Sequence, residues 1–133
     1  MAWDEERTII KLEISTHTLI EPGIIEMRVQ QGRFFELEDA ERSHEAHLAL
    51  AGGTRFCILL DTQNGYFNVS PEAKRKIASP EFAACMKASA FVVNSLSARL
   101  TGNFFIKFLK PVVPTRLFNS REEALNWLRE FNS

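Results

Sequence analysis

A short, continuously apolar run limits the fold of this chain more than any other feature of its sequence. Residues Phe56 to Leu60 read Phe-Cys-Ile-Leu-Leu, with no polar position among them. A run of this kind, bounded by polar residues, predicts a strand that is covered on both faces, as in the centre of a parallel sheet. Asp61 follows directly and closes the strand. We therefore expect an α/β protein in which other segments cover both faces of a sheet.

The segments before this strand predict a hairpin. Thr8 to Ile14 alternates apolar and charged residues, which is the period of a half-buried strand. Ile24 to Val29 is a second apolar segment and follows the turn dipeptide Pro22-Gly23. We expect the two segments to pair in antiparallel fashion across a long loop, and this loop would contain His17.

Helices and strands alternate through the rest of the chain. The first expected helix runs from Glu36 to Ala51 and is ended by Gly52-Gly53. Two short helices begin at Ser70-Pro71 and Ser79-Pro80, and the second runs through Met86. The remaining expected elements are a strand from Ser89 to Val93, a helix from Leu96 to Leu109 ended by Pro111 and Pro114, a strand from Thr115 to Phe118, and a helix after Ser120. This order predicts a mostly parallel, five-stranded sheet with an N-terminal antiparallel hairpin and covering helices. With 133 residues, of which 45% are hydrophobic, residues 1–133 are expected to form one domain.

The charges of the chain nearly cancel. Lys and Arg total 16 and Asp and Glu total 17, so the formal net charge is -1. No overall field attracts a nucleic acid or an anionic lipid surface. The cluster Lys74-Arg75-Lys76 is short and lies near Glu72 and Glu81, so we interpret it as a solvated helix face. No nucleic-acid partner is expected.

Several features indicate a cytoplasmic protein. The acidic residues Asp4, Glu5 and Glu6 have the wrong charge for the start of a signal peptide. No apolar stretch approaches the about 18 residues that a membrane-spanning helix needs. Cys57 and Cys85 have apolar neighbours and are interpreted as reduced core residues, with a disulfide between them as the less favoured alternative.

The order of elements resembles the STAS domain, named for sulfate transporters and anti-sigma factor antagonists, and the wider SpoIIAA-like group. The residues that carry this resemblance are Phe56 to Asp61, which is similar to the family's central strand, Ser89 to Val93, and Pro114 to Phe118. The segment Ala124 to Leu128 is similar to small uncharacterised bacterial STAS/SEC14-like proteins. Nearly the whole chain is covered, but these motifs mostly encode packing. The resemblance therefore implies a fold and no particular reaction.

The resemblance also implies a candidate phosphorylation site. In the anti-sigma factor antagonists, a partner kinase phosphorylates a serine at the start of the helix after the central strand. Ser70 occupies this position, and Thr62 is a weaker substitute. The family's Asp-Ser-Ser-Gly aspartate and glycine are absent from the stretch Phe67 to Glu72. The residues themselves explain Ser70 as a helix N-cap, because Pro71 and Glu72 follow it.

Two sets of polar residues are candidates for a metal or catalytic site. His44 and His47 are one helical turn apart and are flanked by Glu41 and Glu45, but no third ligand has a recognisable position. We expect no metal and no cofactor there. Asp61 lies where parallel sheets often bind ligands, so Asp61, Thr62 and Asn64 are candidates for a polar site at the strand end. A capping role for Asp61 is favoured, since no catalytic triad order, nucleophile elbow or phosphate-binding loop accompanies it.

The expected helix from Leu96 to Leu109 has more apolar residues than one buried stripe needs. Its large apolar residues after the first turn are Leu100, Phe104, Phe105, Ile106, Phe108 and Leu109. Three readings are open. A neighbouring helix covers the excess, the excess binds a second subunit, or it lines a groove for an apolar ligand.

These observations favour a non-enzymatic regulatory or protein-interaction module, which we expect to be a homodimer that uses Leu100, Phe104, Phe105, Phe108 and Leu109. Binding of a small apolar ligand or lipid is the alternative, and it predicts a concave pocket between this helix and the sheet. An enzyme acting at Asp61 is the third hypothesis, and it predicts a polar cleft at the strand ends.

Overall fold

The sheet has six strands, one more than the sequence predicts. The structure is a computed structural model that describes residues 8–30, 32–62 and 68–132. The strands, in spatial order, are β1 (Ile9–Lys11), β2 (Ser15–Glu21), β3 (Ile24–Val29), β5 (Phe56–Asp61), β7 (Met86–Val92) and β8 (Thr115–Phe118). The first three pair in antiparallel fashion, and β3, β5, β7 and β8 are parallel. Two short strands, β4 (Phe34–Phe35) and β6 (Asn68–Val69), pair separately. The mixed α/β architecture is as expected.

The predicted long-loop hairpin is wrong in its connection. β2 pairs with β3 through the tight turn at Pro22-Gly23, where Gly23 has a φ of 84°, and β1 pairs with β2. His17 therefore lies in a strand and not in a loop. The alternation of β2 is hard to recognise because its inward positions include Ser15 and His17, which are polar yet buried.

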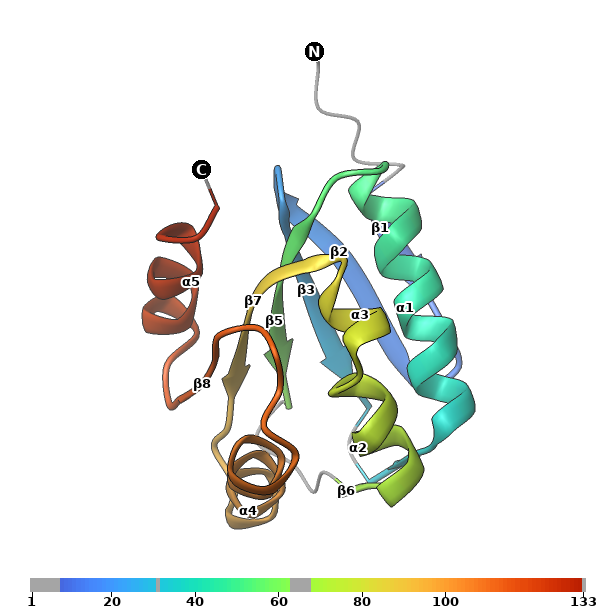
Figure 1. The fold of residues 1–133 in the computed structure, drawn as a ribbon, viewed down its shortest axis with the longest axis vertical. Coiled ribbons are helices and arrows are strands. Elements are labelled where there is room, and N and C mark those ends of the chain that lie inside the picture. The colour runs from blue at the N-terminus through green and yellow to red at the C-terminus, as the bar shows by residue number, and fades with distance from the viewer. Residues whose placement is uncertain (1–7, 31, 63–67, 133) are drawn as a thin grey trace.

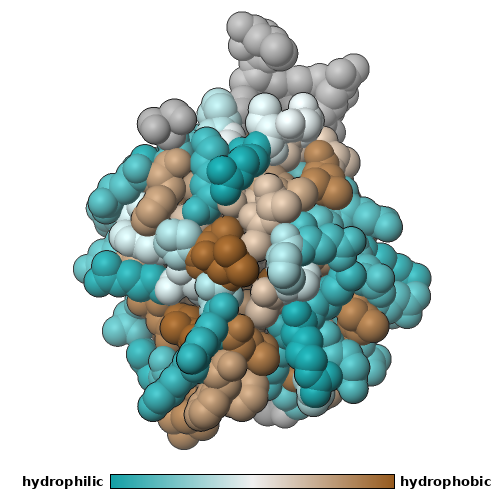
Figure 2. Space-filling model, in the orientation of Figure 1, coloured by the Kyte–Doolittle hydropathy of each residue, from teal (hydrophilic) through white to brown (hydrophobic). Residues whose placement is uncertain are grey.

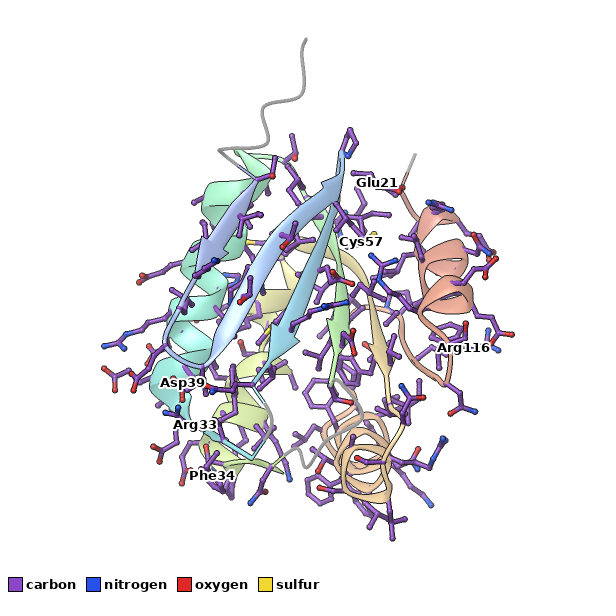
Figure 3. The ribbon with its side chains drawn as sticks, turned by 180° about the vertical axis from the view of Figure 1, so that it is seen from behind. Glu21, Arg33, Phe34, Asp39, Cys57 and Arg116 are labelled. Carbon is purple, nitrogen blue, oxygen red and sulfur yellow. The ribbon has the colours of Figure 1, made fainter. Side chains whose placement is uncertain are left out.

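Five α-helices and one π-helical turn cover the sheet within the residues that the structure describes. They are α1 (Leu37–Ala51), α2 (Pro71–Ile77), α3 (Pro80–Ala83), α4 (Leu96–Phe104), the π turn η2 (Phe105–Leu109) and α5 (Arg121–Arg129). The helices α1 to α4 and the turn η2 pack on one face of the sheet, and α5 packs on the other face (Figure 1). Figure 3 shows the sheet from behind and labels Glu21, whose carboxylate pairs with Arg129 of α5 at 3.0 Å.

The central apolar strand is buried on both faces, as predicted. Ile58 of β5 packs in a cluster with Leu50 and Phe82, on the side of α1 and α3. Leu59, the next residue, packs with Ala124 and Leu128 of α5. This alternation explains why the run contains no polar residue.

Two helix boundaries differ from the sequence prediction. α3 ends at Ala83, and β7 already begins at Met86. The helix expected from Leu96 to Leu109 changes from α to π geometry at Phe105, and Lys110 ends it with a φ of 46°. The acidic residues Asp4 to Glu6 lie outside the described residues.

Candidate functional site

An apolar stripe runs along the outer side of α4 and η2. Its members are Leu96, Leu100, Phe104, Phe108 and Val112, which are spaced four residues apart and are between 43% and 73% exposed. Residues four apart lie on one side of a helix, so the first four members form a continuous ridge. Figure 2 shows apolar side chains gathered at the lower end of the molecule, where Figure 1 places α4. We call these five residues the apolar stripe.

The inner side of the same helix holds it against the core. Ala98, Gly102 and Phe105 are buried, and the Phe105 ring lies 5.6 Å from the ring of Phe91. A Cβ added to Gly102 would lie 2.7 Å from Leu117 Cδ2, so any larger residue there would require the Leu117 side chain to shift. Of the residues expected to form an interface, Leu100, Phe104 and Phe108 point outward, Phe105 points inward, and Leu109 is half-buried against the core.

Several basic side chains lie on the stripe helix or next to it. Between Glu81 and Glu122 the sequence contains no acidic residue. Arg99, Lys107 and Lys110 are exposed on the stripe helix or at its end. The Lys74 ammonium lies 4.6 Å from the centre of the Phe104 ring. The near-zero net charge of the whole chain conceals this local positive surface.

A cavity of about 90 Å³ lies behind the stripe helix, between the helices and the sheet. Most of its lining is apolar, and it includes Met27, Phe35, Ile58, Leu60, Phe91 and Phe105. Ser43 and His47 of α1 contribute polar groups, as does Thr62. The Thr62 hydroxyl donates a hydrogen bond of 3.0 Å to the Val92 carbonyl. This is the position of the concave pocket that the apolar-ligand hypothesis predicts.

A buried hydrogen-bonded chain reaches this cavity. Ser15 Oγ lies 2.8 Å from His17 Nε2, and His17 Nδ1 lies 2.8 Å from His47 Nε2. Burial lowers the pKa of His17 to about 4 and the pKa of His47 well below its usual range, so both imidazoles are neutral at pH 7. Sequence reasoning found no partner for His17, because the partner is contributed by α1, 30 positions away.

His44 and His47 do not converge on a common point. The His44 ring stacks on Phe82 with centroids 3.9 Å apart, whereas His47 bonds to His17. Burial lowers the pKa of His44, and the nearby Glu81 opposes this shift. Among the described residues, no group of three or more His, Cys, Asp or Glu side chains has the arrangement of a metal site.

Ser70 caps α2 from a buried position. Its Oγ accepts a hydrogen bond of 3.1 Å from the Ala73 amide, and the residue is 6% exposed. Ser79, Ser95 and Ser120 cap α3, α4 and α5 in the same way. The structure therefore assigns Ser70 the local role that its neighbours in the sequence indicate.

Asp61 and Thr62 face opposite sides of the sheet. Asp61 Oδ2 lies 3.4 Å from Arg28 Nε, whereas Thr62 lines the cavity. Asp61 belongs to a charged group in which Glu26 also lies 3.7 Å from Arg28 and 2.6 Å from Arg121. Asn64 lies outside the described residues.

The cysteines pack in or against the apolar core clusters, and the basic cluster contains an ion-paired lysine. Cys57 and Cys85 are both free, with Cys57 in the cluster beneath α5 and Cys85 against the cluster on the other face. Burial raises the pKa of the Cys57 thiol. Lys76 of the basic cluster forms an ion pair with Glu81.

Comparison with known proteins supports the fold and leaves the function open. A family described as a domain of unknown function, DUF7793, matches residues 18–132. An uncharacterized protein of the DUF3478 family from Shewanella loihica PV-4, with a SpoIIAA-like fold, matches with a TM-score of 0.56, 14% identity and 90% of each chain covered. No curated protein matches the sequence. The expected SpoIIAA-like fold is thus confirmed. In the described part of the chain, no helix is long and apolar enough to cross a membrane.

Proposed function

The chain belongs to the DUF7793 family, a domain of unknown function, and we propose that it is a non-enzymatic protein-interaction module. We propose further that it forms a homodimer through the apolar stripe. The observation that carries this proposal is the exposure of five large apolar side chains, four of them along α4 and η2 and the fifth, Val112, just after that helix. Contiguous apolar surface of this kind is typical of a protein contact site. A regulatory role for the module would operate through this contact.

The stripe is suited to contact with a second copy of itself. Phe104 is its central member, with Leu100 and Leu96 on one side and Phe108 and Val112 on the other. If two copies cross in antiparallel fashion, Phe104 of one copy meets Phe104 of the other, and Leu100 meets Phe108. The same surface then serves both copies, as a two-fold interface requires.

The core contact of Phe105 supports the same proposal. Phe105 is 6% exposed and packs on Phe91, so it keeps the stripe helix in place without the second copy. Phe104 and Phe108 are 43% and 66% exposed, so their substitution removes little of the core. The interface can therefore be tested without unfolding the chain.

Light scattering of the purified chain tests the proposal. We expect a mass of about twice 15.2 kDa, and a variant with Phe104→Asp and Phe108→Asp to be a folded monomer with an unchanged circular dichroism spectrum. The matched control is Leu48→Asp in α1, because Leu48 is 42% exposed and lies outside the stripe. This control should remain dimeric. A wild-type chain that is monomeric at every concentration, or a stripe variant that stays dimeric, would disprove the interface.

Binding of a small apolar molecule is the second candidate function. The cavity of about 90 Å³ beneath α4 favours it. The two functions are independent, because the stripe uses the outer side of the helix and the cavity uses its inner side.

A further inference from the structure

The cavity wall contains an unsatisfied hydroxyl group. Ser43 of α1 lines the cavity and is 3% exposed. Among the described residues, its Oγ is the only buried side-chain nitrogen or oxygen atom without a hydrogen-bond partner. A buried polar group without a partner costs stability, so native proteins rarely keep one without a use for it.

The other polar groups of the wall have contacts of their own. Thr62 donates to the Val92 carbonyl, and His47 Nε2 is bonded to His17. Lys74 is the only charged residue of the lining, and its ammonium lies over the ring of Phe104, a member of the outer stripe. Ser43 is therefore the group best placed to meet a polar atom of a ligand.

The size and chemistry of the wall define the ligand. An engineered protein cavity of about 150 Å³ holds benzene. This cavity is smaller, about 90 Å³, so its ligand is at most one small ring or a short chain. The lining is largely apolar, and burial lowers the pKa of both His44 and His47, which keeps them uncharged. An ionised ligand would lose its hydration there without an opposite charge.

We propose that this cavity binds a small, neutral, mainly apolar molecule whose single hydroxyl or carbonyl group forms a hydrogen bond with the Ser43 hydroxyl. This inference rests on the second function proposed above and specifies its ligand class. A rotation about the Ser43 Cα–Cβ bond is sufficient to turn the hydroxyl toward the ligand, because side chains interconvert between staggered rotamers. Ala98 and Phe105 form the part of the wall that belongs to the stripe helix.

Phenol and benzene are the probes that test the proposal, because they differ by one hydroxyl group. We expect both to bind the full chain in calorimetric or NMR titrations, with phenol about 2- to 10-fold tighter, the range of one net hydrogen bond. Ser43→Ala should abolish this preference and retain benzene binding. Ser43→Thr keeps a hydroxyl group and is the matched control, so it should retain the preference for phenol.

Two cavity-filling variants test whether the probes bind inside the cavity. Ala98→Val in α4 and Ala40→Val in α1 add volume to the wall from two different helices, and each should weaken both probes at least severalfold while the circular dichroism spectrum stays unchanged. Two substitutions are used so that one folded variant is available if the other does not fold.

The outcomes separate the inference from the function on which it rests. If neither probe binds up to its solubility limit, or if binding is unchanged in the filled variants, both the cavity function and the inference fail. If benzene binds as tightly as phenol, or if Ser43→Ala keeps the preference for phenol, the role of Ser43 is wrong and the apolar-ligand function stands.

Discussion

His17 Nδ1 and His47 Nε2 lie 2.8 Å apart in the interior, and this contact joins strand β2 to helix α1. His17 is 0% exposed and His47 is 7% exposed. Each imidazole supplies a hydrogen-bonding group that the other needs, so two polar residues occupy positions normally filled by apolar ones. Burial disfavours the charged form of each imidazole, and two adjacent imidazolium ions would also repel each other, so the neutral pair is the stable one.

The first prediction is that the chain loses stability in mild acid. Burial lowers the folded-state pKa of His17 from 6.5 to about 4 and also lowers that of His47. Between these values the unfolded state binds more protons than the folded state, so the stabilisation is complete above about pH 6.5 and is lost as the pH falls toward 4. The loss is up to about 1.4 kcal/mol per pH unit for one histidine.

Urea unfolding at pH 7.5 and at pH 5 measures this loss. His17→Asn should lower the free energy of unfolding at pH 7.5, because it disrupts the contact with His47. Because asparagine cannot become protonated, the variant should also show a smaller difference in stability between the two pH values. His44→Asn is the control, because His44 is only partly buried and should change the difference less. An equal loss in the wild-type chain and in His17→Asn would contradict the prediction.

The second prediction is that Ser43→Ala stabilises the chain in the absence of ligand. The substitution removes a buried hydroxyl group without a partner, which costs about 1 kcal/mol or more, and it also improves helix propensity. The thermal unfolding midpoint should rise by a few degrees. Glu45→Ala, at an exposed position of the same helix, shows how much of the rise is helix propensity alone. A lower midpoint for Ser43→Ala would mean that the hydroxyl group has a structural partner.

The third prediction concerns the salt dependence of the homodimer. A two-fold contact brings Arg99, Lys107 and Lys110 of both copies close together, and the stripe helix itself contains no acidic residue. Salt screens repulsion between exposed like charges. The dimer dissociation constant, measured by sedimentation, should therefore decrease as NaCl rises from 50 to about 500 mM, across which the screening length shortens severalfold. A homodimer whose dissociation constant increases with salt would contradict this prediction, because it would mean that the charges of the two copies attract each other.

The fourth prediction assigns Ser70 to helix capping. Ser70→Ala removes the acceptor for the Ala73 amide and should lower the free energy of unfolding by about 1 kcal/mol. Ser70→Asp restores an acceptor at the N-cap and should recover most of the loss. Denaturant unfolding of the three proteins measures the effect. Equal stability of Ser70→Ala and the wild-type chain would leave the capping bond without a role.

The fifth prediction concerns the charged group of Glu26, Arg28, Asp61 and Arg121, on the face of the sheet that α5 covers. The Glu26 side chain is 9% exposed and pairs with Arg121 and Arg28, which are half-exposed. Glu26→Gln leaves both arginines without this carboxylate and should destabilise the chain by about 1–3 kcal/mol, the scale of a hydrogen bond to a charged group. Glu38→Gln is the control, because its pair with Arg42 is exposed and such pairs contribute little. Chemical denaturation that gives equal effects for both variants would contradict this ranking.

Signals that act over a few residues were readable in the sequence. The central strand from Phe56 is apolar because two layers cover it, and this composition is visible without knowing either layer. The serine caps and the glycines after α1 act on backbone groups within one helical turn, so they indicated helix ends correctly. The SpoIIAA-like fold follows from these elements and their order.

Only the tertiary structure decided which side chains meet. The sequence does not predict β2, because its buried Ser15 bonds to His17 of the same strand, and His17 bonds in turn to His47 of a helix 30 positions away. No local pattern records this second partner. The sequence also showed an excess of apolar residues near Phe104 but not its division into an outer stripe and an inner cavity wall. This division depends on how closely α4 packs on β8 at Gly102 and on the π turn at Phe105, and both are properties of the folded contact.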